Sequence, residues 1–270
     1  MSEGIIISCA VTGAIHVPSQ SPYLPITPKE IAGNAIGVAE AGGGSVHIHV
    51  RNPETGEPTM TPEERMVGVK TFEPELASIN MGSINFGLFP AMARIREYKY
   101  DWEEPYLERS KDNVFKNTFY DQERIFKIMQ DTGTKPEMEC YDMAHLYNTA
   151  YWVDKGVIEP PFWLQLIFGI MGGIQPSVED LVYMKTTADK LFGKDYIWST
   201  LAAGRHEYDQ CTAGIIMGGH ARVGMEDNLY LGEMVEKMVR IIRELDREPI
   251  SPDKTRQVLG LKGKGGTAFS

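Results

Sequence analysis

Two hydrophobic periods alternate along the chain. Short apolar runs rich in β-branched and aromatic residues predict strands at residues 5–11, 45–50, 76–81, 136–142, 162–169, 196–204 and 220–226. Amphipathic segments between them predict helices at residues 27–41, 61–73, 115–131, 143–154, 177–192, 207–217 and 231–246. Thr-Pro-x-Glu capping boxes beginning at Thr27 and Thr61 mark two helix starts. This order is typical of a parallel sheet with helices outside.

The alternation predicts an α/β fold, a (β/α)8 TIM barrel, as one domain over residues 1–270. A closed barrel needs eight strands, and the pattern supplies seven. After residue 59 the chain passes from the second strand directly into a capped helix, so about one βα unit of roughly 30 residues is absent. Either the barrel is incomplete, or the sequence omits a segment that the natural protein has. We favour an omission and expect a gap or an extra strand at the Thr59–Met60 junction.

Composition narrows the possible partners. The net charge is −10 and the pI is about 5.2, which argues against binding to nucleic acid or to anionic membranes. No apolar run reaches the roughly 18 residues of a membrane span, and the first residues lack the basic region of a signal peptide. The three cysteines are scattered, which predicts a cytoplasmic protein without disulfides.

Ligand-type side chains lie near the ends of two predicted strands. Alternate residues of a strand share a face, so His47 and His49 point one way, as do Arg222, Gly224 and Glu226 in the last strand. Barrel closure brings these two strands to about 10 Å apart across the first strand. Two histidines and a glutamate are the ligand set of a catalytic zinc site, and the glycine leaves space for a substrate. Barrel enzymes build their active sites at this end.

Simpler readings of the same residues stay open. A histidine pair in a strand also occurs without a metal, and Arg222 with Glu226 or Asp227 can be merely an internal ion pair. The glycines of residues 168–177 can cradle a phosphate before a helix, or can form a plain turn.

Six segments, in order from about residue 5 to residue 263, resemble the β-keto acid cleavage enzymes, a family long classed as a domain of unknown function that includes the 3-keto-5-aminohexanoate cleavage enzymes. They are CAVTGA, PYLPITPKEIA, AGGGSVHIHVRNPETGEPT, INMGSINFG, GGHARVGMEDN and SPDKTRQVLGLKG. The resemblance implies a zinc-dependent barrel that converts a β-keto acid and acetyl-CoA into acetoacetate and a new CoA thioester. It also implies a homo-oligomer, a dimer or a tetramer.

The resemblance assigns roles to individual residues. It implies that His47, His49 and Glu226 are the zinc ligands. It implies that Arg222 and Asp227 form the catalytic pair, with the arginine able to hold a substrate carboxylate.

Two further positions concern the substrate. Ser83 matches a hydroxyl residue that lines the substrate site. Ile15 stands where family members acting on amino-substituted keto acids carry an acidic residue, so we expect a neutral or apolar substrate. Family members also have an N-x-[ST]-T-G-G segment after the second strand that helps bind the keto acid, and it is absent here.

Two other functions remain alternatives. One is a zinc-dependent barrel hydrolase or aldolase that does not use CoA, which a test of CoA dependence separates. The other is a catalytically silent metal-binding protein, which the absent segment supports.

Overall fold

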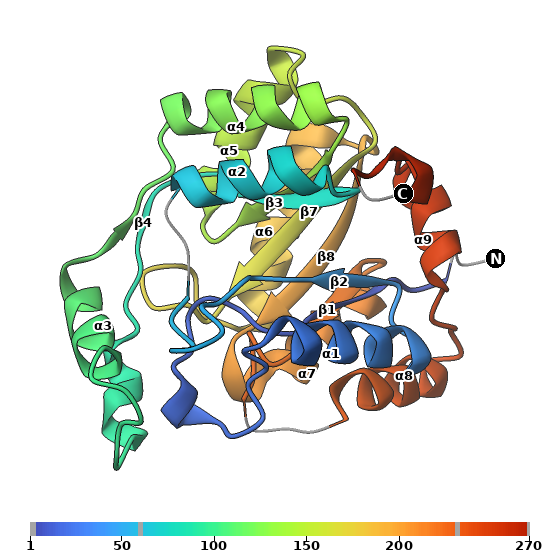
Figure 1. Cartoon of the computed structure of the whole chain (residues 1–270). Coiled ribbons are helices and arrows are strands. Elements are labelled where there is room, and N and C mark those ends of the chain that lie inside the picture. The colour runs from blue at the N-terminus through green and yellow to red at the C-terminus, as the bar shows by residue number, and fades with distance from the viewer. Residues whose placement is uncertain (1–3, 59–61, 230–232, 269–270) are drawn as a thin grey trace.

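Seven parallel strands form one curved sheet with helices outside it (Figure 1). The computed structural model describes residues 4–58, 62–229 and 233–268. In sheet order the strands are β2 (Ser45–His47), β1 (Ile7–Ala10), β9 (His220–Val223), β8 (Tyr196–Ala202), β7 (Phe162–Phe168), β6 (Lys135–Cys140) and β3 (Leu76–Asn80). All seven predicted strands are therefore confirmed, although β2 ends before His49 and β9 ends before Glu226.

The helices alternate with these strands. In the described residues they are α1 (Pro28–Glu40), α2 (Pro62–Phe72), α3 (Glu103–Arg109), α4 (Phe119–Thr132), α5 (Met143–Asp154), α6 (Val178–Phe192), α7 (Glu207–Ile216), α8 (Met234–Glu244) and α9 (Pro252–Leu259). The seven predicted helices are confirmed within four residues at each end. The Thr27 box is present, with its hydroxyl accepting from Glu30 N, whereas Thr61 lies outside the described residues.

The sheet is open where the sequence predicts a missing unit. In the described part of the chain, β2 and β3 are its two edges. An eight-stranded barrel would have its third strand between them, because β3 follows α2 and takes the fourth place. The α/β barrel lacking one unit after residue 59 is thus confirmed as a fold. The Thr59–Met60 junction itself lies outside the described residues.

Two apolar layers fix which strand residues face inward. One layer packs β3, β6, β7 and β8 against α4, α5 and α6, and the other packs β1 and β9 against α1, α7 and α8. Met138 and Cys140 of β6 are fully buried in the first layer. The alternate residues of each strand therefore point to the barrel interior.

A segment without clear periodicity was not predicted. It holds α3 and a two-stranded antiparallel ribbon of β4 (Ile84–Asn85) and β5 (Val114–Phe115). No helix in the described segments is long and apolar enough to cross a membrane.

Candidate active site

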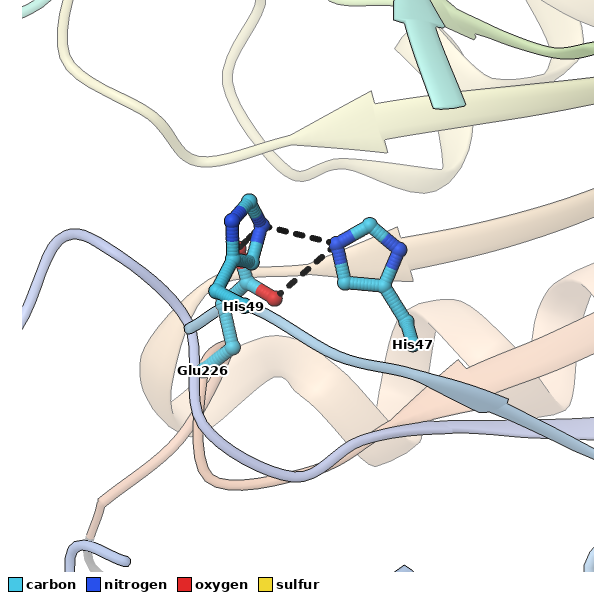
Figure 2. A group of neighbouring side chains, drawn as sticks. All are labelled: His47, His49 and Glu226. Carbon is cyan, nitrogen blue, oxygen red and sulfur yellow. Dashed lines mark hydrogen bonds and ion pairs between the residues drawn. The ribbon is translucent and has the colours of Figure 1, made fainter. Parts of the chain in front are cut away.

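Three potential metal ligands converge near the carboxyl ends of β2 and β9. Figure 2 shows the two imidazoles and the carboxylate pointing at one another. Nε2 of His47 lies 2.9 Å from Nε2 of His49. Glu226 Oε2 lies 3.4 Å from His47 Nε2, and its Oε1 lies 3.4 Å from His49 Nε2. Strand alternation and sheet closure thus bring together the three residues expected from the sequence.

The spacing of these atoms suits one small cation. Ligands held at about 2.0–2.2 Å in a tetrahedral zinc site lie about 3.3–3.6 Å apart. Both distances from Glu226 to the histidines fall in this range, and the two histidine nitrogens, at 2.9 Å, would have to move apart slightly. Burial is the main reason why the pKa of His47 is well below its usual value, with Arg222 adding to the effect. Burial raises the pKa of Glu226, but Arg222, His49 and His47 outweigh it and hold that pKa well below the usual range. A neutral imidazole and an ionised carboxylate are the forms that bind metals.

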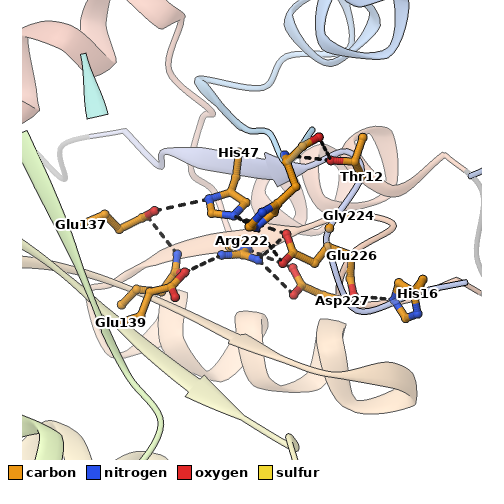
Figure 3. Close-up of polar contacts among 12 residues, drawn as sticks. Thr12, His16, His47, Glu137, Glu139, Arg222, Gly224, Glu226 and Asp227 are labelled. Carbon is orange, nitrogen blue, oxygen red and sulfur yellow. Dashed lines mark hydrogen bonds and ion pairs between the residues drawn. The ribbon is translucent and has the colours of Figure 1, made fainter. Parts of the chain in front are cut away.

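Arg222 is the centre of a buried charge network (Figure 3). Its side chain is 3% exposed, and its Nε and Nη2 donate to the two oxygens of Asp227 at 3.0 and 3.3 Å. Nη1 donates to Glu139 Oε1 at 3.2 Å and to Gln165 Oε1 at 2.9 Å. Nη2 also lies 3.0 Å from Glu226 Oε2. The guanidinium therefore donates four hydrogen bonds to three neighbouring side chains and forms an ion pair with a fourth, Glu226.

These contacts surround the arginine that the resemblance pairs with Asp227. In the structure Arg222 binds Asp227 and balances the carboxylates around it. Its contact with a substrate carboxylate stays a prediction.

Two inward glutamates of β6 were missed by the sequence analysis. Trp163 Nε1 donates to Glu137 Oε1 at 2.6 Å, and Glu137 Oε2 lies 3.9 Å from His47 Nδ1. Burial raises the pKa of Glu137 to about 7 and also raises that of Glu139, which accepts from the Tyr141 hydroxyl. The signal was present, because acidic residues alternate with apolar ones in PEMEC.

Residues close to Ile15 in the segment after β1 contact Glu226. A Cβ on Gly13 would meet the Glu226 side chain at 2.5 Å, and the His16 ring makes a 2.6 Å hydrogen bond to Glu226 O. Ser83 follows β3 at the same end of the barrel, and its exposed hydroxyl accepts from Asn117 N. The described contacts do not connect Ser83 with the histidines.

The position of Gly224 requires a glycine on structural grounds. A Cβ there would lie 2.3 Å from Ala10 O, and its φ is +144°. The backbone of this residue passes close to β1. The space for a substrate expected at Gly224 stays a prediction.

The chain matches the model of a known family. The model for the β-keto acid cleavage enzymes matches residues 4–64 and, separately, residues 57–261. Residues 57–64 thus match two places of the model, at the point where the sheet is open. The match covers nearly the whole chain.

Two similar proteins match this chain over nearly their whole length. The 3,5-dioxohexanoate:acetyl-CoA acetone transferase of Paraburkholderia graminis is 43% identical over 304 aligned positions, which cover 98% of each chain. The 3-keto-5-aminohexanoate cleavage enzyme of Fusobacterium nucleatum is 29% identical, covering 97% of this chain and 100% of that protein. Because 270 residues cannot fill 304 positions, at least 34 positions of the first alignment have no residue here.

Solved structures resemble the fold at low identity. The apo structure of ObcA has a TM-score of 0.66 and 15% identity, covering 89% of this chain and 66% of that one. The complex of ObcA with oxaloacetate has a TM-score of 0.63 and 14% identity, with 89% and 68% covered.

Proposed function

The chain belongs to the β-keto acid cleavage enzyme family, and from that premise we propose a zinc-dependent exchange reaction. A β-keto acid and acetyl-CoA are converted into acetoacetate and the CoA thioester of the remaining acyl group. The observation that carries this proposal is the convergence of His47, His49 and Glu226 beside the Arg222–Asp227 pair.

Zinc would be held by the two histidines and Glu226. When bound, it supplies Lewis-acid polarisation of a keto oxygen, which makes the neighbouring carbon more acidic. The ligand chemistry supports this choice, because two nitrogens and one carboxylate leave a position open to substrate.

Asp227 is the proposed general base. Burial raises its pKa to about 7, Arg222 works against this rise, and Glu226 adds to it. A base whose pKa lies near the working pH transfers protons efficiently. Arg222 fixes the orientation of this carboxylate through two N–H groups and is a positioning residue in this scheme.

The exchange balances without any external oxidant or reductant. Asp227 takes a proton from C2 of the β-keto acid, and the resulting enolate attacks the thioester carbonyl of acetyl-CoA through C2. The C–S bond of acetyl-CoA breaks and releases the CoA thiolate, which then attacks the C3 carbonyl. The C2–C3 bond breaks and leaves the enolate of acetoacetate. The released acetoacetate takes back the proton, and the acyl group leaves as its CoA thioester.

We propose a substrate with a neutral distal end. Ile15 offers no anion to a substrate ammonium group. Burying that charge without a partner costs on the order of several kcal/mol. The relative at 43% identity is named for 3,5-dioxohexanoate, whose distal end is an uncharged ketone. Ser83 is the proposed hydroxyl that lines the keto-acid site.

The decisive experiment is a panel of β-keto acids with acetyl-CoA, followed by the appearance of acetoacetate. We expect Asp227→Asn to lower kcat by about 100-fold or more. Asp209→Asn is the matched control, because that carboxylate is 85% exposed on α7. Product formation without CoA would instead support a hydrolase or aldolase, and no turnover with zinc bound would support a silent metal-binding protein.

Zinc binding has its own test. We expect one zinc per chain by elemental analysis, lost in His47→Ala and in His49→Ala. His206→Ala is the control, since its side chain is 40% exposed and contacts Asp209. We further propose a homo-oligomer located in the cytoplasm, where reduced thiols suit the three free, buried cysteines. Sizing in solution tests the assembly.

A further inference from the structure

The turn after β9 is tight and presents both the proposed carboxylate ligand and the proposed base. In residues 224–228, Gly224 O accepts hydrogen bonds from Asp227 N (3.0 Å) and Asn228 N (2.9 Å). The start of the turn lies against the β1 backbone, where a Cβ on Gly224 would be 2.3 Å from Ala10 O. Figure 3 shows the turn beside the charge network. A shift of this turn would therefore move two functional carboxylates at once.

Glu207, the first residue of α7, contacts both ends of this turn. Its Oε1 accepts from Gly224 N at 3.0 Å, and its Oε2 accepts from Asn228 Nδ2 at 3.3 Å. Three residues earlier, Gly204 N donates to Asp227 O at 2.7 Å. The start of α7 and the preceding loop thus hold the turn at three points.

The burial of Glu207 calls for a reason. Its side chain is 0% exposed, although it takes no part in the reaction as proposed. Burial and the neighbouring Asp227 raise its pKa to about 8, while the N–H groups of Gly224 and Asn228 work against the rise. Burying a carboxyl group costs folding free energy unless hydrogen bonds compensate for the lost water. Both side-chain hydrogen bonds described for it go to the turn.

We propose that Glu207 is a positioning residue, whose carboxyl group fixes the 224–228 turn so that Glu226 and Asp227 face the same centre. This inference rests on the proposed function. Glutamine has the same length, and its amide oxygen can still accept from Gly224 N. Its amide nitrogen can only donate, so the second contact is kept when the Asn228 side-chain amide turns over and presents Oδ1 as the acceptor. Aspartate is one methylene shorter and cannot reach both ends of the turn, and alanine reaches neither.

The test compares Glu207→Ala, Glu207→Asp and Glu207→Gln. Zinc affinity is measured by competition with a chelator, and kcat and KM are measured with acetyl-CoA and 3,5-dioxohexanoate. We expect the alanine and aspartate variants to lose about 10–100-fold in zinc affinity and in kcat, as supporting partners of metal ligands do. The KM for acetyl-CoA should change less than kcat. The glutamine variant should stay within about threefold of wild type.

Glu179→Ala is the matched control. Glu179 also lies in the first turn of a helix, α6, but its side chain is exposed. It should leave zinc affinity and kcat unchanged. A purely structural role for Glu207 would lower the yield of folded protein without changing kcat or zinc affinity per folded chain, and that result would overturn the proposal.

Hydrogen exchange separates this inference from the proposed function. If the wild type neither binds zinc nor turns over, the proposed function fails, but exchange of the backbone amides in 224–228 can still be measured. Faster exchange in Glu207→Ala and Glu207→Asp, but not in Glu207→Gln, would support the positioning role. Equal exchange in all variants would overturn it.

Discussion

Replacing Arg222 by methionine should cost far more stability than an ordinary ion-pair mutation. The guanidinium is 3% exposed and lies 3.0–3.2 Å from Glu139, Glu226 and Asp227. Methionine fills much of the same volume but leaves three buried carboxyl groups without a cation. Breaking a buried ion pair in this way costs about 3–5 kcal/mol, a large share of the roughly 5–15 kcal/mol that stabilises a domain.

The sign of the pH dependence follows from the same contacts. Without Arg222 the pKa values of the buried carboxyl groups rise above those of the unfolded chain, so the folded variant binds more protons. Its stability therefore falls as the pH rises from the usual carboxyl range toward the raised values. The free-energy difference between wild type and Arg222→Met should be larger at pH 7.5 than at pH 5.5.

Urea denaturation of the zinc-free protein at both pH values measures these free energies of unfolding. Arg256→Met is the control, because Arg256 makes a bidentate pair with Glu75 in which both side chains are partly exposed. That pair should be worth about 1 kcal/mol or less. The reasoning is refuted if Arg222→Met costs no more than the control at pH 7.5, or if its cost does not shrink at pH 5.5.

Three further predictions follow from particular residues. We expect the wild type to prefer 3,5-dioxohexanoate over 3-keto-5-aminohexanoate by more than about tenfold in kcat/KM. Ile15→Glu should narrow or reverse this ratio, because the substrate ammonium, unpaired in the wild type, gains a carboxylate partner. Burial lowers the pKa of His220 to about 4, so its contribution to stability should fall by about 3 kcal/mol as the pH drops from 6.5 to 4. The urea denaturation midpoint of His220→Gln should fall less over this pH range than that of the wild type. Equal pH dependence of the two midpoints would contradict the prediction. A further variant receives, within residues 57–64, the segment of the 43%-identical relative that has no counterpart in this chain. Its urea midpoint and its m-value should both rise, since the insertion adds buried surface. An unchanged m-value would count against a missing βα unit.

The sequence predicted the parts of the site that depend on strand alternation. His47 and His49 lie two residues apart, as do Glu137 and Glu139, so the face that each pair shares follows from the period alone. The proximity of the two histidines to Glu226 was predicted from the position of β1, which pairs with β2 on one side and with β9 on the other. The family resemblance then supplied roles that no spacing could give.

Other features depend on three-dimensional detail that local pattern does not encode. The contact between Glu139 and Arg222 joins residues 83 apart, and it depends on the curvature of the sheet. The set of partners that Arg222 finds depends on the directions of its guanidinium N–H groups. No helix or strand was predicted for residues 84–114, because α3 and the β4–β5 ribbon are too short to produce a hydrophobic period.

The two histidines proposed as zinc ligands are held by contacts from one side only, because β2 is an edge strand in the described structure. Thr12, after β1, accepts a hydrogen bond from His49 N and donates one to His49 O, both at 2.9 Å, so its hydroxyl takes the place of a strand partner (Figure 3). Val11 N donates to His47 O at 3.2 Å. All three contacts come from the β1 side, opposite the missing third strand. The backbone that carries the two histidines is therefore held from the side of the sheet that the described structure contains, and we expect a third strand on the other side to change it little. Metal binding and catalysis should accordingly respond differently to restoring the segment, with catalysis gaining more.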